Sequence, residues 1–347
     1  MPRASARAAG ALRMRGLATA LPSQLTAGFR VGQELAPPAA GRPTAVYVVG
    51  MGGSAIAADL VRSIVGAETP VELVPIRSPD LPRAVDRRSR IVLVSYSGST
   101  WETVRAYDGA GRVGASRFVV TSGGLLAERA ARDDVPVLPL PPGLPPRAAV
   151  GQIFGGLLGL LDPWFPESNE GRVVRVAGRL SRLISQYSAP RGPAAKIAAR
   201  IGGRVPVVYA EASFAGVARR WKDQFEENAK RLAVFDEAPE LYHNAIVGWD
   251  AISRVEAARF AVLLLSWAGG LAATRRSFDY LERLLSQRGA VVIPVPLDAE
   301  DRLEATLAAV AIGDLVSLSL AERRGVDPYP TDAIGRLKSA LGAKKTQ

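Results

Sequence analysis

The sequence lacks cysteine altogether and contains a single histidine among its 347 residues. Without cysteine the chain can form no disulfide and carry out no thiol chemistry, which agrees with an expected cytoplasmic location. With one histidine it also lacks the clustered histidine and carboxylate ligands that a metal enzyme uses. We therefore expect a protein that works without a bound metal.

Hydrophobic runs of membrane-spanning length are also lacking. The longest stretches with few charges cover residues 148–161 and 260–274, whereas a spanning helix needs about 20 apolar residues. Apolar residues still make up 48% of the chain, which is enough for two buried cores. The sequence thus predicts a soluble protein with no membrane partner.

Positive charge is in excess and is concentrated near the ends of the chain. There are 44 Lys and Arg against 33 Asp and Glu, a formal net charge of +11. The first thirty residues hold five arginines and no acid, which is typical of a mitochondrial presequence or a disordered leader. No helix-turn-helix, zinc or interleaved aromatic and basic pattern accompanies this charge, so we expect no nucleic-acid partner. A positive field would instead attract an anionic substrate.

Short apolar strands alternate with helical stretches in two parts of the chain. Five predicted strands lie between residues 45 and 140, and further ones, including 245–249, lie between 205 and 295. This alternation predicts the α/β class, with two doubly wound parallel sheets in two domains. We expect a basic leader at 1–30, a first domain at 31–165, a second domain at 166–330, and a C-terminal helix and tail at 331–347.

Two loops rich in glycine and serine, at 50–54 and 95–100, each follow a predicted strand and precede a predicted helix. Glycine lets the backbone approach a ligand closely, and helix N-termini attract anions. The loops contain neither the GxGxxG spacing of a dinucleotide site nor the lysine of a P-loop. They predict a seat for a small phosphate such as a sugar phosphate, although ordinary turns also use these residue types. Their hydroxyl donors are Ser54, Ser95, Ser97 and Thr100.

Acid and base candidates occur in the second half of the chain. His243 is the one side chain whose unperturbed pKa lies near neutral pH, but a lone histidine is more often a surface or core residue. Glu226 and Glu227 stand together near the end of a predicted helix. Either glutamate could be a buried base or a solvated residue, and their spacing does not choose between these roles.

The two loops, the segment 227–230 (Glu-Asn-Ala-Lys) and the segment 240–244 (Glu-Leu-Tyr-His-Asn) occur in this order along the chain. Together they resemble the bifunctional phosphoglucose/phosphomannose isomerase family, from about residue 45 to the end. The resemblance implies a pair of sugar isomerase (SIS) domains. It also implies interconversion of glucose 6-phosphate and mannose 6-phosphate with fructose 6-phosphate, through a cis-enediol and without a metal or another cofactor.

The resemblance also assigns roles to individual residues. The phosphate of the hexose 6-phosphate would be held by Ser54, Ser95, Ser97 and Thr100, with Gly52 and Gly53 allowing its approach. Glu227 matches the catalytic base, and Arg147 matches the arginine that stabilises the enediolate. His243 matches a ring-opening residue contributed by the neighbouring subunit of a homodimer. Lys338 matches a lysine near the ring oxygen, and Thr331 matches a threonine that leaves room for the carbon 2 epimer.

Other interpretations remain at this point. On the sequence alone, Arg147 fits a solvated loop arginine, and Lys338 fits a lysine placed near a helix C-terminus by the helix dipole. SIS domains also occur as non-catalytic modules that bind sugar phosphates and regulate other processes. Such a regulator would keep the serine loops but would have no need of Glu227, Arg147 and His243, all of which are present.

Overall fold

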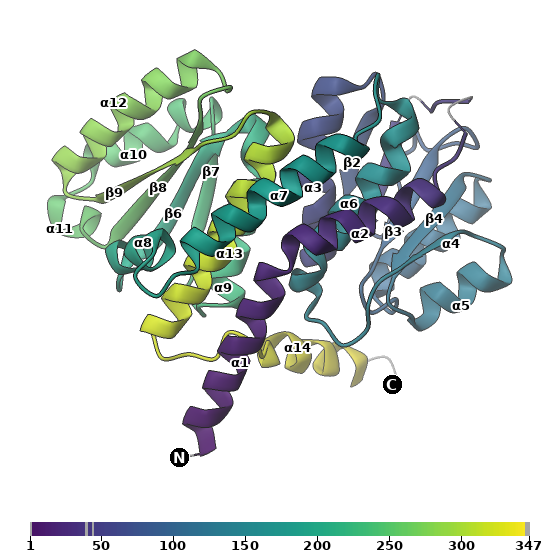
Figure 1. Ribbon diagram of the computed structural model, residues 1–347, viewed down its shortest axis with the longest axis horizontal. Coiled ribbons are helices and arrows are strands. Elements are labelled where there is room, and N and C mark those ends of the chain that lie inside the picture. Colours follow the sequence, from purple (N-terminus) through teal and green to yellow (C-terminus); the bar gives the residue numbers. More distant parts are fainter. Residues whose placement is uncertain (1, 39–40, 44, 344–347) are drawn as a thin grey trace.

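Two separate parallel sheets form the framework of the protein in this computed structural model, which describes residues 2–38, 41–43 and 45–343 (Figure 1). The first sheet has the order β2-β1-β3-β4-β5 and consists of β1 (Ala45–Gly50), β2 (Glu72–Ile76), β3 (Arg90–Val94), β4 (Ser116–Thr121) and β5 (Val137–Pro139). The second has the order β7-β6-β8-β9 and consists of β6 (Val205–Glu211), β7 (Val234–Ala238), β8 (Phe260–Trp267) and β9 (Val291–Leu297). All neighbouring strands pair in parallel. The predicted α/β class with two parallel sheets is confirmed.

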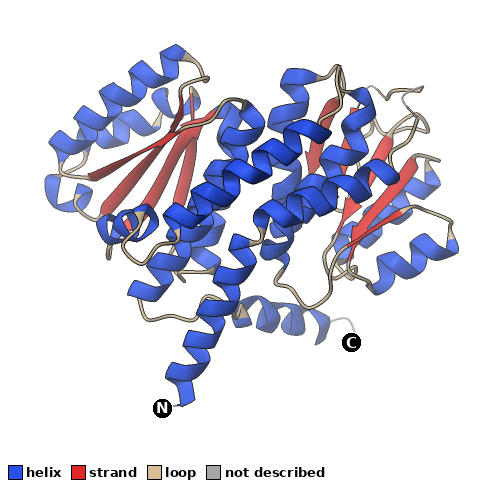
Figure 2. Ribbon diagram, in the orientation of Figure 1, coloured by secondary structure: helices blue, strands red, loops and turns tan. Residues whose placement is uncertain are grey.

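Helices cover both faces of the first sheet (Figure 2). They are α3 (Gly53–Glu68), α4 (Trp101–Arg112), α5 (Gly124–Arg132) and α6 (Val150–Leu161). Side chains along a strand alternate between the two faces, so Val46 and Val48 share a core with α3 and α6, whereas Tyr47 and Val49 share the opposite core with α4 and α5. The apolar side chains on the two faces of each strand therefore pack into two separate hydrophobic cores.

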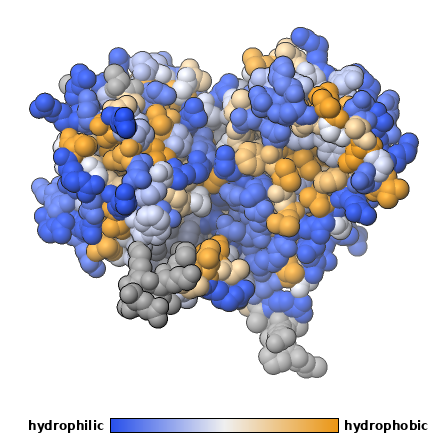
Figure 3. All heavy atoms as spheres, turned by 180° about the vertical axis from the view of Figure 1, so that it is seen from behind, coloured by the Kyte–Doolittle hydropathy of each residue, from blue (hydrophilic) through white to orange (hydrophobic). Residues whose placement is uncertain are grey.

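The helices that follow α6 pack on the second sheet or between the two sheets, except the C-terminal helix, which lies apart from the second sheet at the bottom of Figure 1. They are α7 (Glu170–Tyr187), α8 (Pro193–Ile201), α9 (Ala215–Glu227), α10 (Ala245–Ala251), α11 (Arg254–Ala257), α12 (Ala272–Arg288), α13 (Arg302–Arg323) and α14 (Asp332–Ala343). Short 3-10 turns occur at η1 (Pro146–Ala149), η2 (Asp162–Trp164), η3 (Ala212–Phe214) and η4 (Glu240–Tyr242). The rear surface is largely hydrophilic, with hydrophobic residues in separate patches (Figure 3).

Helix α13 joins the two units. It packs against α3, α7, α8 and α9, and its apolar residues belong to one core that reaches both sheets. Among the described residues it is the one helix long and apolar enough to cross a membrane, but its apolar stretch is completely buried inside the protein. Its composition is therefore explained by a central place in the core.

The N-terminal residues differ from the predicted disordered leader. They form α1 (Pro2–Thr19) and α2 (Leu21–Glu34), and α2 packs along α6 with Leu25 and Phe29 buried. A Cβ at Gly28 would come within 2.3 Å of the Gln152 carbonyl oxygen, so the backbones of α2 and α6 are in direct contact. The predicted boundary after residue 30 falls inside α2. Small residues that allow this close packing, together with apolar side chains at helical spacing on the same face, order α2.

Two elements of the second unit also differ from the sequence prediction. Residues 245–249 form part of helix α10 and not a strand, and the Asn244 side chain accepts a hydrogen bond from the first backbone N–H of that helix. The strand in this region is β7, at the edge of the sheet and partly exposed. A five-residue apolar run does not distinguish helix from strand, and the acidic residues Asp236 and Glu237 hide the apolar pattern of β7.

Candidate active site

The two serine-rich loops begin side by side at the carboxyl edge of the first sheet. Strand β1 pairs with β3 so that Gly50 lies opposite Val94, the last residue of β3. The chain passes from β1 to β2 on one side and enters β3 on the other. Ligands of open α/β sheets bind where the strand order switches in this way. The predicted phosphate seat therefore lies at the expected place in the fold.

Glycines in these loops have conformations or neighbours that exclude a side chain. Gly52 and Gly98 have φ angles of 51° and 64°, which side chains disfavour. A Cβ at Gly98 would lie 1.7 Å from the Gly123 carbonyl oxygen. A Cβ at Gly53 would lie 3.1 Å from the backbone nitrogen and Cα of Arg147. The start of helix α3 thus touches the backbone of Arg147.

Hydroxyl groups and two helix N-termini surround this seat. The Ser54 hydroxyl is buried and accepts a hydrogen bond from the Tyr96 backbone N–H at 3.3 Å. Ser95, also buried, donates to the Thr100 hydroxyl at 2.9 Å, and Ser97 is exposed. Helices α3 and α4 begin here, and their first N–H groups carry partial positive charge. The structure brings these four hydroxyls to one edge, as predicted.

Tyr96 connects the seat to the loop that carries Arg147. Its hydroxyl donates a hydrogen bond to the Pro141 carbonyl oxygen at 2.6 Å and accepts one from the Leu144 backbone N–H at 2.6 Å. These bonds fix the proline-rich loop immediately before η1, in which Arg147 lies. These hydrogen bonds therefore place Arg147 beside the two loops predicted to bind phosphate.

Arg147 is buried, with 3% of its surface exposed, so the solvated loop arginine is excluded. Its Nε donates to Asn228 Oδ1 at 2.8 Å, and its Nη1 lies 3.2 Å from Glu227 Oε2. Its Nη2 donates to the carbonyl oxygens of Pro328 at 2.6 Å and Tyr329 at 3.1 Å. Burial lowers the pKa of Arg147, but an arginine stays charged. The guanidinium is held by two segments distant in the sequence, 227–228 and 328–329.

Glu227 is the last residue of α9, and 26% of its side chain remains exposed. Burial raises its pKa, and the positive charge of Arg147 opposes this shift without cancelling it. A carboxylate is disfavoured at a helix C-terminus, where the partial charge is negative. The position makes the Glu227 carboxylate more basic than usual while the cation keeps it oriented.

Lys230 is a second cation at the site, and the sequence interpretation gave it no role. Its φ angle of 52° is rare for a residue with a side chain. Its Nζ donates to the carbonyl oxygens of Glu227 at 2.5 Å and Pro330 at 2.7 Å, and burial lowers its pKa. Lys230 therefore ties the end of α9 to the segment 328–330 that also holds Arg147.

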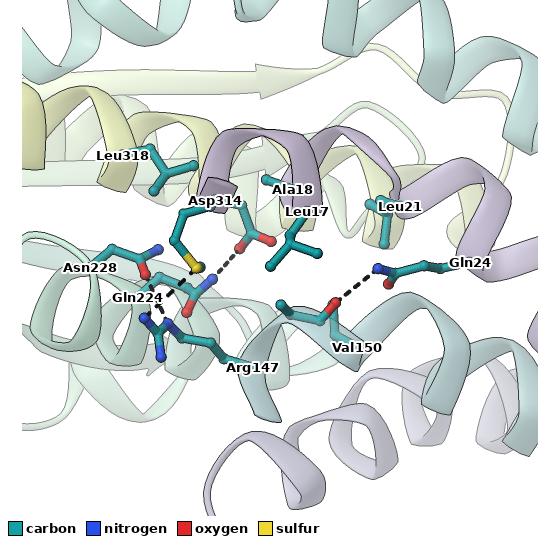
Figure 4. Close-up of a pocket in the computed structure, with 12 residues that line it drawn as sticks. Leu17, Ala18, Leu21, Gln24, Arg147, Val150, Gln224, Asn228, Asp314 and Leu318 are labelled. Carbon is teal, nitrogen blue, oxygen red and sulfur yellow. Dashed lines mark hydrogen bonds between the residues drawn. The ribbon is translucent and has the colours of Figure 1, made fainter. Parts of the chain in front are cut away.

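A buried polar layer lies behind Arg147 (Figure 4). Arg220 is 2% exposed, pairs with Asp314 at 2.7 Å, and donates to the Arg147 carbonyl oxygen at 3.1 Å. Gln224 donates to the other Asp314 oxygen at 2.8 Å. Asp314 is the only acid between Glu304 and Glu322 in an otherwise apolar helix, and this was the signal from which the layer could have been predicted.

The structure does not bring His243 to the other site residues within one chain. His243 is exposed and follows η4, beyond the carboxyl end of β7. Glu227 ends the helix that leads into β7, and so lies toward the opposite edge of the second sheet. The 13 residues of α9 span about 20 Å. A shared site would therefore require His243 from another subunit.

The C-terminal candidates lie beyond the segment that holds Arg147. Thr331 directly follows Pro330, and its carbonyl oxygen accepts the Ile334 N–H at the start of α14. Lys338 lies in α14, but its side chain is outside the described residues. In the described part of the chain, no three His, Cys, Asp or Glu side chains gather as metal ligands would.

Comparison with known proteins relates most of the chain to phosphoglucose/phosphomannose isomerases. Residues 191–341 match the model of the bacterial phospho-glucose isomerase C-terminal SIS domain. A bifunctional phosphoglucose/phosphomannose isomerase of Caldicellulosiruptor bescii is 30% identical over 334 residues, which cover 94% of this chain and 98% of the relative.

Other proteins match a shorter part of the chain or share the fold alone. A D-glucosamine-6-phosphate 4-epimerase of Sulfolobus acidocaldarius is 34% identical over 198 residues, covering 57% of this chain and 61% of the relative. The C-terminal domain of a glucosamine-fructose-6-phosphate aminotransferase from Francisella tularensis has a TM-score of 0.69 at 12% identity, covering 91% of this chain and 96% of that one. The latter shows the SIS fold alone. With the full-length match above, the chain belongs to the bifunctional phosphoglucose/phosphomannose isomerase family.

Proposed function

We propose that this protein interconverts glucose 6-phosphate and mannose 6-phosphate with fructose 6-phosphate. One observation carries the proposal: the ion pair of Arg147 and Glu227 directly adjoins the serine-rich seat, because Gly53 contacts the backbone of Arg147. A phosphate held in the seat would therefore leave the other end of a short sugar within reach of a partly buried base and a buried cation. Family membership supports the same assignment.

The chemical step moves one proton between carbon 1 and carbon 2 of the open-chain sugar, and a second proton from the hydroxyl at one of these carbons to the carbonyl oxygen at the other. Glu227 removes the proton from one carbon, giving a cis-enediol with developing negative charge on oxygen, and returns it to the other carbon. Positioned proton transfer contributes roughly 10²–10⁴ in rate. Arg147, already fixed by four hydrogen-bond acceptors, stabilises the enediolate with little reorganisation. Binding energy from the phosphate orients the reacting carbons.

Residues further from the Arg147–Glu227 pair would open the sugar ring and allow both carbon 2 epimers to bind. In our proposal His243 of a second subunit and Lys338 transfer protons at the ring oxygen and the hydroxyl at carbon 1. Thr331, next to the segment that binds Arg147 and Lys230, leaves room for either configuration at carbon 2. The same site would then accept both aldoses.

Two alternatives come from other classes of activity. A non-catalytic sugar-phosphate regulator would use the seat but would gain nothing from a partly buried carboxylate with a raised pKa beside a fixed arginine. An epimerase acting at carbon 4, as named for the relative from Sulfolobus acidocaldarius, would need its reactive groups near the middle of the sugar. The carboxylate next to the seat is compatible with either position, so the assay must include both substrates.

The decisive experiment incubates the purified protein, in the presence of a chelator, with fructose 6-phosphate and separately with D-glucosamine 6-phosphate. We expect glucose 6-phosphate and mannose 6-phosphate from the first reaction and no epimer from the second. Turnover of D-glucosamine 6-phosphate alone would support the epimerase. Tight binding of fructose 6-phosphate without turnover by the folded protein would support the regulator.

Mixed dimers test whether His243 acts in the site of a neighbouring subunit. Glu227→Gln and His243→Ala chains should each be inactive alone. If each site combines Glu227 of one chain with His243 of the other, random assortment gives half hybrid dimers with one intact site. The mixture should recover about a quarter of wild-type activity, as expected for a symmetric dimer. Verified hybrids without activity would contradict a histidine supplied by the partner.

The pH dependence of kcat/KM tests the state of Glu227. Activity should fall as pH falls through the Glu227 pKa, because the protonated carboxyl cannot accept a proton. Burial and Asp223 raise this pKa, while Arg147, Arg220 and Lys230 lower it, with a net rise. On the acidic side of the pH profile (the acidic limb), the midpoint of the fall in kcat/KM should therefore lie above the usual pKa of glutamate, about 4.3.

Asp223→Asn provides the matched comparison for this profile. Removing the Asp223 charge takes away a group that raises the Glu227 pKa, so the acidic limb should move to lower pH. Sugar phosphates themselves titrate near pH 6, as phosphate monoesters do, and the shift between the variants is more informative than either midpoint. An unchanged limb in Asp223→Asn would mean that Glu227 does not control it.

A further inference from the structure

Helix α1 lies against the segment that holds Arg147. It packs on α13 and on η1, and Figure 1 shows it beside the chain between α13 and α14. Arg7 donates a hydrogen bond to the Gly325 carbonyl oxygen at 2.6 Å. Arg13 donates to the Gly143 carbonyl oxygen at 3.0 Å, and its guanidinium lies 4.4 Å from the centre of the Tyr329 ring. These arginines thus join the C-terminal segment to the loop before Arg147.

The far end of α1 closes the space behind Arg147. Met14 is 3% exposed, and its Sδ lies 4.0 Å from Arg147 Nη2. Leu17 and Ala18 line a cavity of about 10 Å³ together with Arg147 and Gln224 (Figure 4). A cavity of this size holds at most about one water. The helix therefore keeps bulk water away from one side of the guanidinium.

The turn formed by residues 327–330 connects α1 to the two cations of the site. The Asp327 carboxylate accepts a hydrogen bond from the Tyr329 backbone N–H at 2.9 Å. The carbonyl oxygens of Pro328 and Tyr329 hold Arg147, and that of Pro330 holds Lys230. Both cations of the site thus depend on the conformation of one short turn, and α1 lies directly on that turn.

We propose that α1 is a positioning element of the active site, which fixes the 327–330 turn and thereby orients the Arg147 guanidinium. This inference rests on the proposed isomerase function. Among the described side chains of α1, residues 7–19, only Met14 is buried. The helix therefore adds little to the hydrophobic core, and its contacts concentrate on the segments that hold Arg147. Loosening it should affect catalysis more than folding.

Two glycines of α1 give a matched pair of variants. A Cβ at Gly10 would lie 2.1 Å from Asp327 Oδ1 and 2.7 Å from its Cγ, so Gly10→Ala must displace the carboxylate that caps the turn. A Cβ at Gly16 meets nothing within 4 Å. Both substitutions replace glycine by alanine within the helix, and each is expected to increase helix propensity by the same amount, about 1 kcal/mol. Any difference between the two variants therefore reports the contact with the turn.

We expect Gly10→Ala to lower kcat by on the order of 10-fold to 100-fold, because small misplacements of catalytic groups have effects of this size. KM for fructose 6-phosphate should stay close to that of the wild type, since the phosphate seat is untouched. Gly16→Ala should match the wild type in both constants. Arg13→Gln, which removes the contact with Tyr329 without a steric clash, should change kcat in the same direction as Gly10→Ala.

Hydrogen exchange of the 325–331 segment gives a readout that does not depend on activity. Exchange should be faster in Gly10→Ala and Arg13→Gln than in Gly16→Ala. If the wild type shows no isomerase activity, the proposed function fails, but this comparison still reports whether α1 fixes the turn. Equal exchange in the three variants would overturn the inference, and so would faster exchange with an unchanged kcat.

Discussion

Replacing Glu227 by glutamine should lower kcat by about 10²–10⁴ or more, the size expected for loss of a positioned base. The amide cannot accept a proton from carbon 1 or carbon 2, although its oxygen can still accept the hydrogen bond from Arg147. Arg147 keeps its acceptors on Asn228, Pro328 and Tyr329, so the fold should be retained. Steady-state kinetics with fructose 6-phosphate and circular dichroism measure the two effects.

Glu226→Gln is the control for this prediction. Glu226 precedes Glu227 in the same helix, is exposed to a similar degree, and pairs with Lys222 at 2.6 Å instead of Arg147. Its replacement should leave kcat close to that of the wild type. Binding of inorganic phosphate, measured by calorimetry, should be unchanged in both variants because the seat is intact. Similar activities for the two variants would remove Glu227 from the role of base.

The first sheet and its loops were predictable because their local sequence signals agree with the fold. Each β-branched run is followed by glycine or serine and then by a helical pattern, and the structure starts both loops at the register pair Gly50 and Val94. Edge strand β7 was missed because Asp236 and Glu237 interrupt its apolar pattern. Helix α10 was mistaken for a strand because a short apolar run fits both periods.

The role of α1 and α2 could not be predicted from composition. An arginine-rich segment without acids has the signature of a leader, yet here the arginines bind backbone carbonyl oxygens of distant segments. The glycines of α2 matter only because another helix backbone lies against them. Both facts depend on the tertiary structure, which the local sequence does not contain.

The candidate site likewise contains some residues that the sequence indicates and others that only the tertiary structure brings together. The serine loops and Glu227 occur in recognisable segments, whereas the burial of Arg147 depends on Pro328 and Tyr329, more than 180 residues later in the chain. Asn228 and Lys230 lie within the segment that carried the resemblance, but no local pattern shows that they bind Arg147 and Pro330. Long-range hydrogen bonds to backbone carbonyl oxygens cannot be predicted from the residue types in the sequence.

These long-range bonds make Arg147→Lys the second change with a large expected effect. A lysine keeps the positive charge, but its single ammonium cannot reach Asn228, Glu227 and the two carbonyl oxygens at once, as the planar guanidinium does. We expect kcat to fall by about 10²–10³, the cost of losing one preorganised donor to a developing oxyanion. KM should change less than kcat, because the phosphate binds elsewhere.

Arg147→Met separates the charge of Arg147 from its geometry. Removing Arg147 takes away the charge that opposes the effect of burial on Glu227 most strongly, so the acidic limb of kcat/KM should move to higher pH, whereas in Arg147→Lys it should stay near the wild-type position. Leaving buried carbonyl oxygens without donors costs roughly 1–3 kcal/mol each, so both variants should also melt at lower temperature. A lysine variant with wild-type kcat would show that charge alone suffices. The hydrogen bonds to Pro328 and Tyr329, and the helix α1 that supports them, would then have no part in orienting the catalytic cation.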